Sequence, residues 1–280
     1  MNPQTLLHLC SFTYFDLPGI YARRLARGEA VPLCEAARAL RRMDGLGALT
    51  CGAYLEDVSG VLSALEASPL NILAYENDNA GTGFAAYAFA APKETIIAVR
   101  GSETKGECVP TNVDWRDNFC APLAGSVQYA AATALANRYD GPLLLTGHSK
   151  GGNVALYAQG ATQNPLARAA VFNAQGFACH ALTKAQKQRL HAGAVNYVVA
   201  GDVVGALLCH PETRFYVRQN PHTNAHSPAA YAFDAEGFPL PARRTWLSCA
   251  VEVLSRALLL LETLGITNIT RRLLACPTPA

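Results

Sequence analysis

The chain has 280 residues, of which 50% are hydrophobic and 16% charged, and its formal net charge is +2 at pH 7. This composition is typical of a globular protein and excludes a disordered chain. The charge is too small for the basic surface of a nucleic-acid-binding protein, so we expect no nucleic-acid partner. The length suits one large α/β domain or two small domains.

Nine cysteines, an odd number, are spread from Cys10 to Cys276 without a C-x-x-C pair. A secreted disulfide framework would have an even number at close spacing, and a structural zinc site would have paired ligands. We therefore expect no metal, and most cysteines buried as small hydrophobic side chains in a reducing compartment. The N-terminus lacks the basic start of a signal peptide, and "ALLLLETLGI" is too short to cross a bilayer. These features predict a cytoplasmic protein without stable membrane insertion.

The first seventy residues are predicted to be mainly helical. "LLHLCSFTYF" and "LCEAARALRRM" carry apolar residues at helical spacing, and "SGVLSALEASP" ends at a proline. The pattern then changes, because "NILAYEND" and "FAAYAFAA" flank the turn residues Asn79 to Gly83 and predict two joined strands. The β-branched run "TIIAVRG" predicts a buried central strand. Residues 1–70 are therefore expected to form a helical extension before the sheet.

Strands and helices alternate through the rest of the chain, a pattern typical of a mainly parallel sheet with helices on both faces. We expect one α/β domain over residues 1–280, with residues 242–280 as a helical segment packed on it and residues 103–113 as a polar loop. The predicted strands are "PLLLTG", "RAAVFNA", "AVNYVVAG" and "TRFYVRQ", and the predicted helices are "SVQYAAATALANRY", "GNVALYAQGATQ", "LTKAQKQRLHA" and "TWLSCAVEVLSRALLLLETL".

The segment "LLLTGHSKGGNVALYA", residues 143–158, contains the pattern G-x-S-x-G between a predicted strand and a predicted helix. This is the context of a nucleophile elbow, a tight strand-to-helix turn that exposes a reactive serine, here Ser149. The turn needs small neighbours, which Gly147, Gly151 and Gly152 supply. The helix N-terminus behind the serine favours negative charge on a developing oxyanion. An ordinary glycine-rich connection is the alternative.

Two other glycine-rich segments fit nucleotide sites less well. "GSETKGEC" has Glu107 and Cys108 where a phosphate-binding loop requires Lys and Ser or Thr. "GTGFAA", residues 81–86, lies between two predicted strands and has no helix after it, which favours a hairpin turn over a dinucleotide site. We therefore expect no nucleotide cofactor.

A nucleophilic serine requires a base, and the base requires an acid that orients it. In a strand–elbow–helix fold these follow in the order Ser, Asp or Glu, His. Asp202 comes directly after the predicted strand "AVNYVVAG", at the same sheet edge as Ser149, although a helix cap is its plain structural interpretation. His222 and His226 both lie in the loop where the base is expected. His148, beside the serine, is interpreted as a packing or hydrogen-bonding neighbour.

An oxyanion hole needs two donors. The first is the backbone N–H of Lys150, the residue after the predicted nucleophile. The second is expected after "TIIAVRG", where Ser102 offers its backbone N–H and its hydroxyl. A plain strand end, with Arg100 paired to a carboxylate, is the alternative for this segment.

Five motifs in order carry a family resemblance: "IIAVRGS", "DWRDN", "LLLTGHSKGGNVALYA", "AGDVVG" and "AHSPAAYAF". Together they resemble the class 3 lipase type of α/β-hydrolase and, within it, most closely the bacterial Mbeg1-like family. The resemblance implies an α/β-hydrolase fold and a catalytic triad of Ser149, Asp202 and His226, and so favours His226 over His222. It also implies that Ser102 contributes to the oxyanion hole.

Two departures from true lipases concern the substrate. Lys150 stands where lipases usually have leucine, and residues 103–113 lack the apolar, tryptophan-bearing character of an interfacial lid. We therefore expect hydrolysis of small-molecule or lipid-like carboxylic esters through an acyl-enzyme, without cofactor or metal, and leave the acyl group and the oligomeric state open. A thioesterase or peptidase-like acyl hydrolase would use the same residues. A non-catalytic protein that binds an acyl ligand or a protein partner is the alternative from another class.

Overall fold

The structure is a computed structural model that describes residues 1–43, 57–102, 117–118, 125–178 and 180–267, so the predicted loop 103–113 lies outside the described residues. Within these ranges, eight strands form one sheet in the order of the chain. Strands β1 to β4 pair antiparallel, and strands β4 to β8 pair parallel. The strands are β1 (Val31–Pro32), β2 (Asn71–Asp78), β3 (Phe84–Ala90), β4 (Thr95–Val99), β5 (Leu143–Gly147), β6 (Ala167–Phe172), β7 (Ala194–Val199) and β8 (Thr213–Val217).

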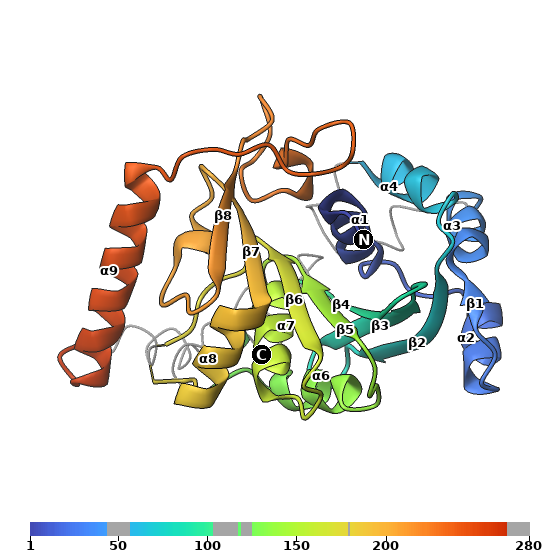
Figure 1. The fold of residues 1–280 in the computed structure, drawn as a ribbon, viewed down its shortest axis with the longest axis horizontal. Coiled ribbons are helices and arrows are strands. Elements are labelled where there is room, and N and C mark those ends of the chain that lie inside the picture. Colours follow the sequence, from blue (N-terminus) through green and yellow to red (C-terminus); the bar gives the residue numbers. More distant parts are fainter. Residues whose placement is uncertain (44–56, 103–116, 119–124, 179, 268–280) are drawn as a thin grey trace, which may run out of the picture.

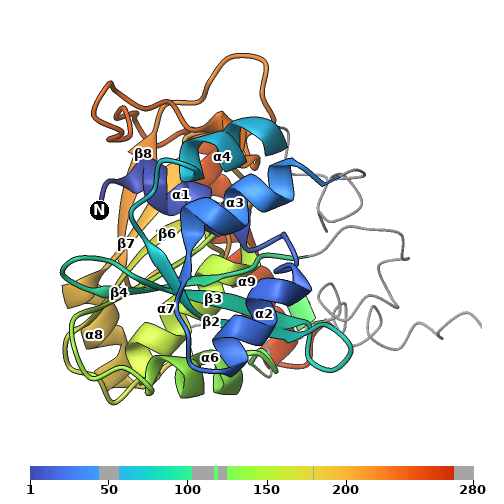
Figure 2. The ribbon, with the colours of Figure 1, turned by 90° about the vertical axis from the view of Figure 1, so that its right-hand side faces the viewer.

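Helices cover both faces of the sheet: α1, α3 and α4 lie on one face, and α6, α7 and α8 on the other (Figures 1 and 2). Helix α2 packs beside β1 and β2 at one edge, and α9 lies at the opposite edge. From β5 to β7, helices alternate with parallel strands, and the short turn η2 leads from β7 to β8. The predicted α/β-hydrolase fold is confirmed. The helices are α1 (Pro3–Phe12), α2 (Gly19–Ala26), α3 (Leu33–Arg41), α4 (Val58–Leu65), α6 (Tyr129–Ala136), α7 (Lys150–Ala161), α8 (Lys184–Gly193) and α9 (Trp246–Thr263), with short 3-10 turns η2 (Val204–Ala206) and η3 (Pro228–Ala230).

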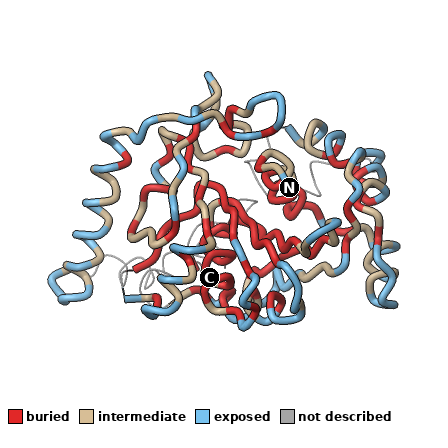
Figure 3. Tube along the Cα trace, viewed as in Figure 1, coloured by how far each residue is buried: buried red, intermediate tan, exposed pale blue. Residues whose placement is uncertain are grey.

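The sheet separates two hydrophobic cores. In β4, Ile96 and Ala98 belong to the core under α1, α3 and α4, whereas Ile97 and Val99 belong to the core under α6, α7 and α8. This division follows because successive side chains of a strand point to opposite faces. The buried positions run along the strands through the middle of the molecule (Figure 3). The continuous apolar runs of the predicted central strands reflect burial on both faces.

Helix α1 is built into the first core. Leu9 and Phe12 are fully buried, and the ring of Phe12 meets that of Tyr87 edge-on with centroids 5.1 Å apart. The hydroxyl of Tyr87 donates to the carbonyl of Phe15 at 2.8 Å, which joins the end of the N-terminal helical segment to β3. These contacts support our proposal that residues 1–280 form one domain.

Helix α9 is attached at the opposite edge by polar contacts. The hydroxyl of Thr245, its N-cap residue, donates to the carbonyl of Ala200 at 3.0 Å. Arg214 of β8 donates to Glu252 of α9 at 2.8 Å. These contacts hold the helix beside the segment that follows β7. Among the described residues, no helix has the length and apolar character that a bilayer crossing requires.

The described cysteines differ in state. Cys10 is free and buried, with its Sγ 3.3 Å from the hydroxyl of Thr146, and burial raises the pKa of this thiol to about 12. Cys34 and Cys249 are also free, but Cys209 is disulfide-bonded, which departs from the expectation of reduced cysteines. Disulfides are more typical of oxidising compartments. The cytoplasmic location therefore stays a prediction.

We expect Leu9→Ala to lower the free energy of unfolding by about 2 to 5 kcal/mol, because it leaves a cavity between α1 and the sheet. If residues 1–280 are one domain, urea unfolding of this variant shifts as a single transition in both circular dichroism and tyrosine fluorescence. Ile20→Ala on α2, where the side chain is 60% exposed, is the control and should shift stability by less than about 0.5 kcal/mol. A separate early transition that leaves the remainder folded would contradict the single-domain proposal.

Candidate active site

Ser149 occupies a sharp turn between β5 and α7. Its φ of 57° and ψ of −125° lie in a region that non-glycine residues rarely adopt. Its N–H donates to the carbonyl of Phe172 at 2.9 Å, which ties the turn to the end of β6. This strained backbone is the conformation that a nucleophile elbow requires to project its serine away from the sheet.

Two glycines make this turn possible. A Cβ on Gly147 would lie 2.4 Å from the carbonyl carbon of Gly151, and a Cβ on Gly151 would lie 2.3 Å from the carbonyl oxygen of Val99. Nearby, a Cβ on Gly101 would lie 2.8 Å from the carbonyl oxygen of His148. All three distances are shorter than van der Waals contact. The ends of β4 and β5 and the start of α7 therefore touch through bare backbone.

Ser149, His226 and Asp202 form a continuous chain of hydrogen bonds. Nε2 of His226 lies 2.9 Å from Oγ of Ser149, and Nδ1 lies 2.9 Å from Oδ1 of Asp202. A carboxylate only accepts hydrogen bonds, so Nδ1 carries the proton and donates it to Asp202. Nε2 of the neutral imidazole is then the acceptor for the serine hydroxyl. A base in this position can remove the hydroxyl proton.

Asp202 is buried directly after β7, and both of its carboxylate oxygens have partners. Oδ1 accepts from His226, and Oδ2 accepts the backbone N–H of Gly205 at 2.6 Å. The backbone N–H of Asp202 donates to the carbonyl of Val199 at 2.8 Å. The carboxylate is therefore held in one orientation toward the imidazole.

The structure brings His226, and not His222, to Asp202. The side chain of His226 is 13% exposed, so one edge of the imidazole reaches solvent. His222 is exposed in a turn, with a φ of 63°. The two histidines, which the residues alone left open, thus occupy different environments.

Asn173, directly after β6, is a further residue of this site that the sequence analysis did not identify. Its Nδ2 donates to the carbonyl of Ala225 at 3.0 Å, and its Oδ1 accepts the N–H of Val199 at 2.9 Å. Its φ of 44° lets one side chain reach both segments. Asn173 thereby joins the loop of His226 to the strand that precedes Asp202. The predicted strand "RAAVFNA" included Asn173, whereas β6 ends at Phe172, so its position at the strand end gave no separate signal.

His148 is a fully buried neighbour of the Ser149–His226–Asp202 chain, with its ring centroid 5.0 Å from that of His226. Burial lowers the pKa of His148 well below its ordinary value because the imidazolium would lose its hydration, and the charge of a protonated His226 lowers it further. His148 is therefore neutral at pH 7 and packs beside His226, in agreement with its interpretation as a neighbour.

Ser102 and Lys150, the predicted oxyanion-hole residues, lie at the end of β4 and at the start of α7. Lys150 is the first residue of α7, and N–H groups in the first turn of a helix point out of its end. The hydroxyl oxygen of Ser102 accepts from Nδ2 of Asn118 at 2.7 Å. At the same strand end, Nη2 of Arg100 donates to the carbonyl of Gly83 at 2.7 Å.

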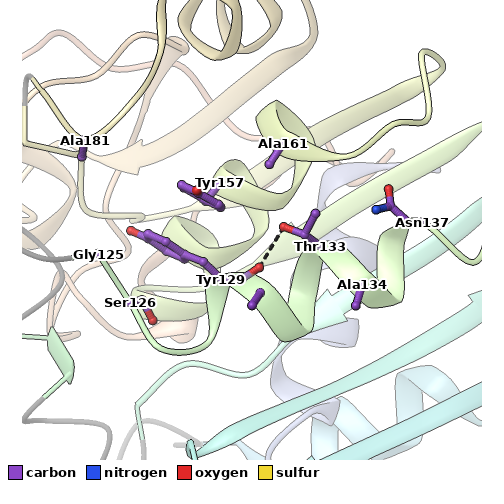
Figure 4. Close-up of a pocket in the computed structure, with 10 residues that line it drawn as sticks. Gly125, Ser126, Tyr129, Thr133, Ala134, Asn137, Tyr157, Ala161 and Ala181 are labelled. Atoms are coloured by element: carbon purple, nitrogen blue, oxygen red, sulfur yellow. Dashed lines mark hydrogen bonds between the residues drawn. The ribbon is translucent and has the colours of Figure 1, made fainter.

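Other sites in the described residues fit ligands less well. A pocket of about 660 Å³ lies between α6 and α7, where the rings of Tyr129 and Tyr157 stack with centroids 3.9 Å apart (Figure 4). None of the described residues that line it belongs to the Ser149–His226–Asp202 chain. Among the same described residues, no group of three or more His, Cys, Asp or Glu side chains is placed to hold a metal ion.

We expect Gly151→Ala to destabilise the elbow, because the added methyl would overlap the carbonyl oxygen of Val99. The loss in free energy of unfolding should be about 1 to 3 kcal/mol, measured by urea titration. Gly160→Ala on the same helix is the matched control. A Cβ there lies 3.4 Å from Cβ of Gln186 and has room, so this change should be neutral or slightly stabilising. Equal effects of the two substitutions would contradict the steric explanation.

The buried His148 also predicts a pH dependence. In the unfolded chain His148 binds a proton below about pH 6.5, its ordinary pKa. In the folded state its pKa is lowered, so the imidazole stays neutral at that pH. Stability present above pH 6.5 should therefore be lost as the pH falls, by up to about 1.4 kcal/mol per pH unit. Urea unfolding between pH 5 and 8 measures this slope. His148→Leu should flatten it and the exposed-site control His222→Ala should not, whereas an unchanged slope in His148→Leu would overturn the explanation.

Comparison with known proteins places the chain in a family. It is similar in structure to a mono- and diacylglycerol lipase from Aspergillus oryzae (15% identity, 84% of this chain and 90% of that chain covered, TM-score 0.49) and to Lip2 lipase from Yarrowia lipolytica (10% identity, 90% of each chain covered, TM-score 0.41). At these identities and TM-scores, neither structure assigns an activity to this chain. Comparison with curated protein sequences gave no match. The Mbeg1-like family model matches residues 69–256, and the chain therefore belongs to the Mbeg1-like family, as its motifs predicted.

Proposed function

We propose that this protein is a serine hydrolase that cleaves carboxylic esters through an acyl-enzyme intermediate. The observation that carries the proposal is the chain from Asp202 through His226 to Ser149, with two contacts of 2.9 Å that end at a serine whose φ is 57°. Backbone strain of this kind costs free energy and is concentrated at functional sites. An oriented base beside a strained serine is the arrangement that nucleophilic catalysis requires.

In the proposed mechanism, His226 takes the hydroxyl proton as Oγ of Ser149 attacks the ester carbonyl carbon. The carbonyl π electrons move to oxygen, and the backbone N–H groups of Ser102 and Lys150 stabilise this oxyanion. The imidazolium, stabilised by Asp202, then protonates the leaving alkoxide as the carbon–oxygen bond breaks. Water, deprotonated by His226, attacks the acyl carbon. The bond from that carbon to Oγ of Ser149 breaks, the imidazolium returns its proton to Oγ, and the acid is released. No cofactor or metal takes part.

The substrate is proposed to be a small-molecule or lipid-like ester. Thioester and amide carbonyls can undergo the same acyl transfer, so the leaving group distinguishes esterase from thioesterase or peptidase-like activity.

Ser149→Ala should lower ester hydrolysis by about 10³-fold or more, because the nucleophile is lost while the fold is kept. A panel of p-nitrophenyl esters from acetate to palmitate, with one acyl thioester, measures the activity and the acyl preference. Thermal unfolding of both proteins checks the fold. Hydrolysis that survives in Ser149→Ala would overturn the serine assignment. Failure of a fluorophosphonate probe to label Ser149 would favour a non-catalytic acyl-binding protein.

His226→Ala should abolish turnover to a similar extent because Ser149 loses its base, whereas His222→Ala should stay within a few-fold of the wild type. The two variants are compared on the best ester of the panel at pH 8. They are matched controls for each other, since both histidines lie in the same loop. Inactivity of His222→Ala alone would contradict the assignment of the base.

A further inference from the structure

A buried ion pair lies directly beside the elbow. Nζ of Lys150 is 3.1 Å from Oδ2 of Asp117, and the two side chains are only 2% and 3% exposed. Removing two charges from water costs free energy that their attraction often fails to recover, and an apolar side chain of similar volume is usually as stable or more stable. A contribution to folding stability therefore does not explain why this ion pair is present. One of its members, Lys150, is also the residue that stands where true lipases usually have leucine.

Asp117 joins the elbow to the start of α6. Its Oδ1 accepts the backbone N–H of Val127 at 3.0 Å, and its Oδ2 accepts a short hydrogen bond from the hydroxyl of Ser126. Ser126 lies three residues before the start of α6 at Tyr129, and the two residues are close together (Figure 4). One carboxylate thus holds the side chain of Lys150 and the backbone that leads into α6. A carboxylate with this many partners has a single orientation.

The next residue, Asn118, continues the connection to Ser102. Its Nδ2 donates to the hydroxyl oxygen of Ser102 at 2.7 Å. Because the amide nitrogen only donates, the hydroxyl oxygen is the acceptor, and the hydroxyl proton of Ser102 is left to point toward another acceptor. Lys150, Asp117, Asn118 and Ser102 therefore form a path between the two proposed oxyanion donors.

We propose that Lys150 and Asp117 are positioning residues for the oxyanion hole. Their ion pair fixes Asn118, and through it Ser102, relative to the backbone N–H of Lys150. The same lysine thus supplies one donor through its backbone and holds the other through its side chain. This inference rests on the proposed function, because it assigns the oxyanion hole of that same site. Donors help a transition state only when they are already in place as charge develops.

Lys150→Met tests the side chain alone, because the backbone N–H and most of the volume are kept. We expect kcat for the best ester to fall about 10- to 100-fold with KM nearly unchanged, because misplaced donors weaken transition-state stabilisation and not ground-state binding. Asp117→Asn should show the same loss of kcat and, because it leaves a buried ammonium without its carboxylate, a lower thermal midpoint. A kcat within two-fold of the wild type in Lys150→Met would overturn the proposal.

The double variant Lys150→Met with Asp117→Asn separates positioning from stability. Removal of both charges should restore the thermal midpoint lost in Asp117→Asn, while kcat stays low because the connection to Ser102 is still broken. If the double variant recovers kcat as well as the thermal midpoint, the ion pair has only a structural role and the proposal is wrong. Arg168→Met is the control: it breaks the ion pair of Arg168 with Glu94, 2.9 Å apart at the start of β6, and should leave kcat unchanged.

Hydrogen exchange supplies a measurement that does not depend on catalysis. The Val127 amide donates to Asp117, so its exchange should accelerate in Lys150→Met if the lysine holds that carboxylate in place. An unchanged exchange rate of the Val127 amide in Lys150→Met would contradict the proposal that Lys150 holds the carboxylate of Asp117 in place. Failure of the proposed function is distinct: wild-type protein would then neither hydrolyse the panel nor label at Ser149. Activity that depends on Ser149 but not on Lys150 would remove only this inference.

Discussion

The site depends on one steric constraint, the contact of bare glycine backbone between the start of α7 and the carboxyl ends of β4 and β5. At Gly147 and Gly151, no Cβ fits between these elements. The turn can close only with Ser149 in a strained conformation, φ 57°, that lifts the side chain off the sheet. Because parallel strands end at one edge, the residues after β4, β6 and β7 then lie around the serine: Ser102, Asn173 and Asp202.

Around this turn, polar side chains fix the orientation of the loops that follow the strands. Asn173 connects the loop of His226 to β7, and the N–H of Gly205 fixes Asp202. Each hydrogen bond contributes only about 0.5 to 1.5 kcal/mol net to stability, but a buried donor or acceptor left without a hydrogen bond costs more. The two cores on either side of the sheet supply the stability that tolerates a strained serine and buried polar groups. Rigid strands and bonded loops together orient the imidazole.

The sequence predicted some elements of the fold correctly and missed others. The apolar runs of β4 and β5 were predictable because burial on both faces removes polar residues from a strand. The start of α7 was predicted at Gly152, whereas the helix begins two residues earlier, at Lys150. The close packing of Gly147 against Gly151 at this turn is a tertiary contact that the local pattern does not carry. The two-residue β1 was not predicted, because so short a strand has no periodicity and exists only through its pairing with β2.

The sequence by itself determined the alternation of strands and helices, the glycines that a tight turn demands, and the order along the chain of Ser149, Asp202 and then a histidine, His222 or His226. These are local or sequential properties, set by backbone periodicity and by the space that a side chain requires. Only the tertiary structure decided that His226 and not His222 meets Asp202, and that Nζ of Lys150 meets Asp117. Such encounters join residues far apart in the chain through irregular loops. Their geometry is set by long-range packing, which leaves no period in the sequence.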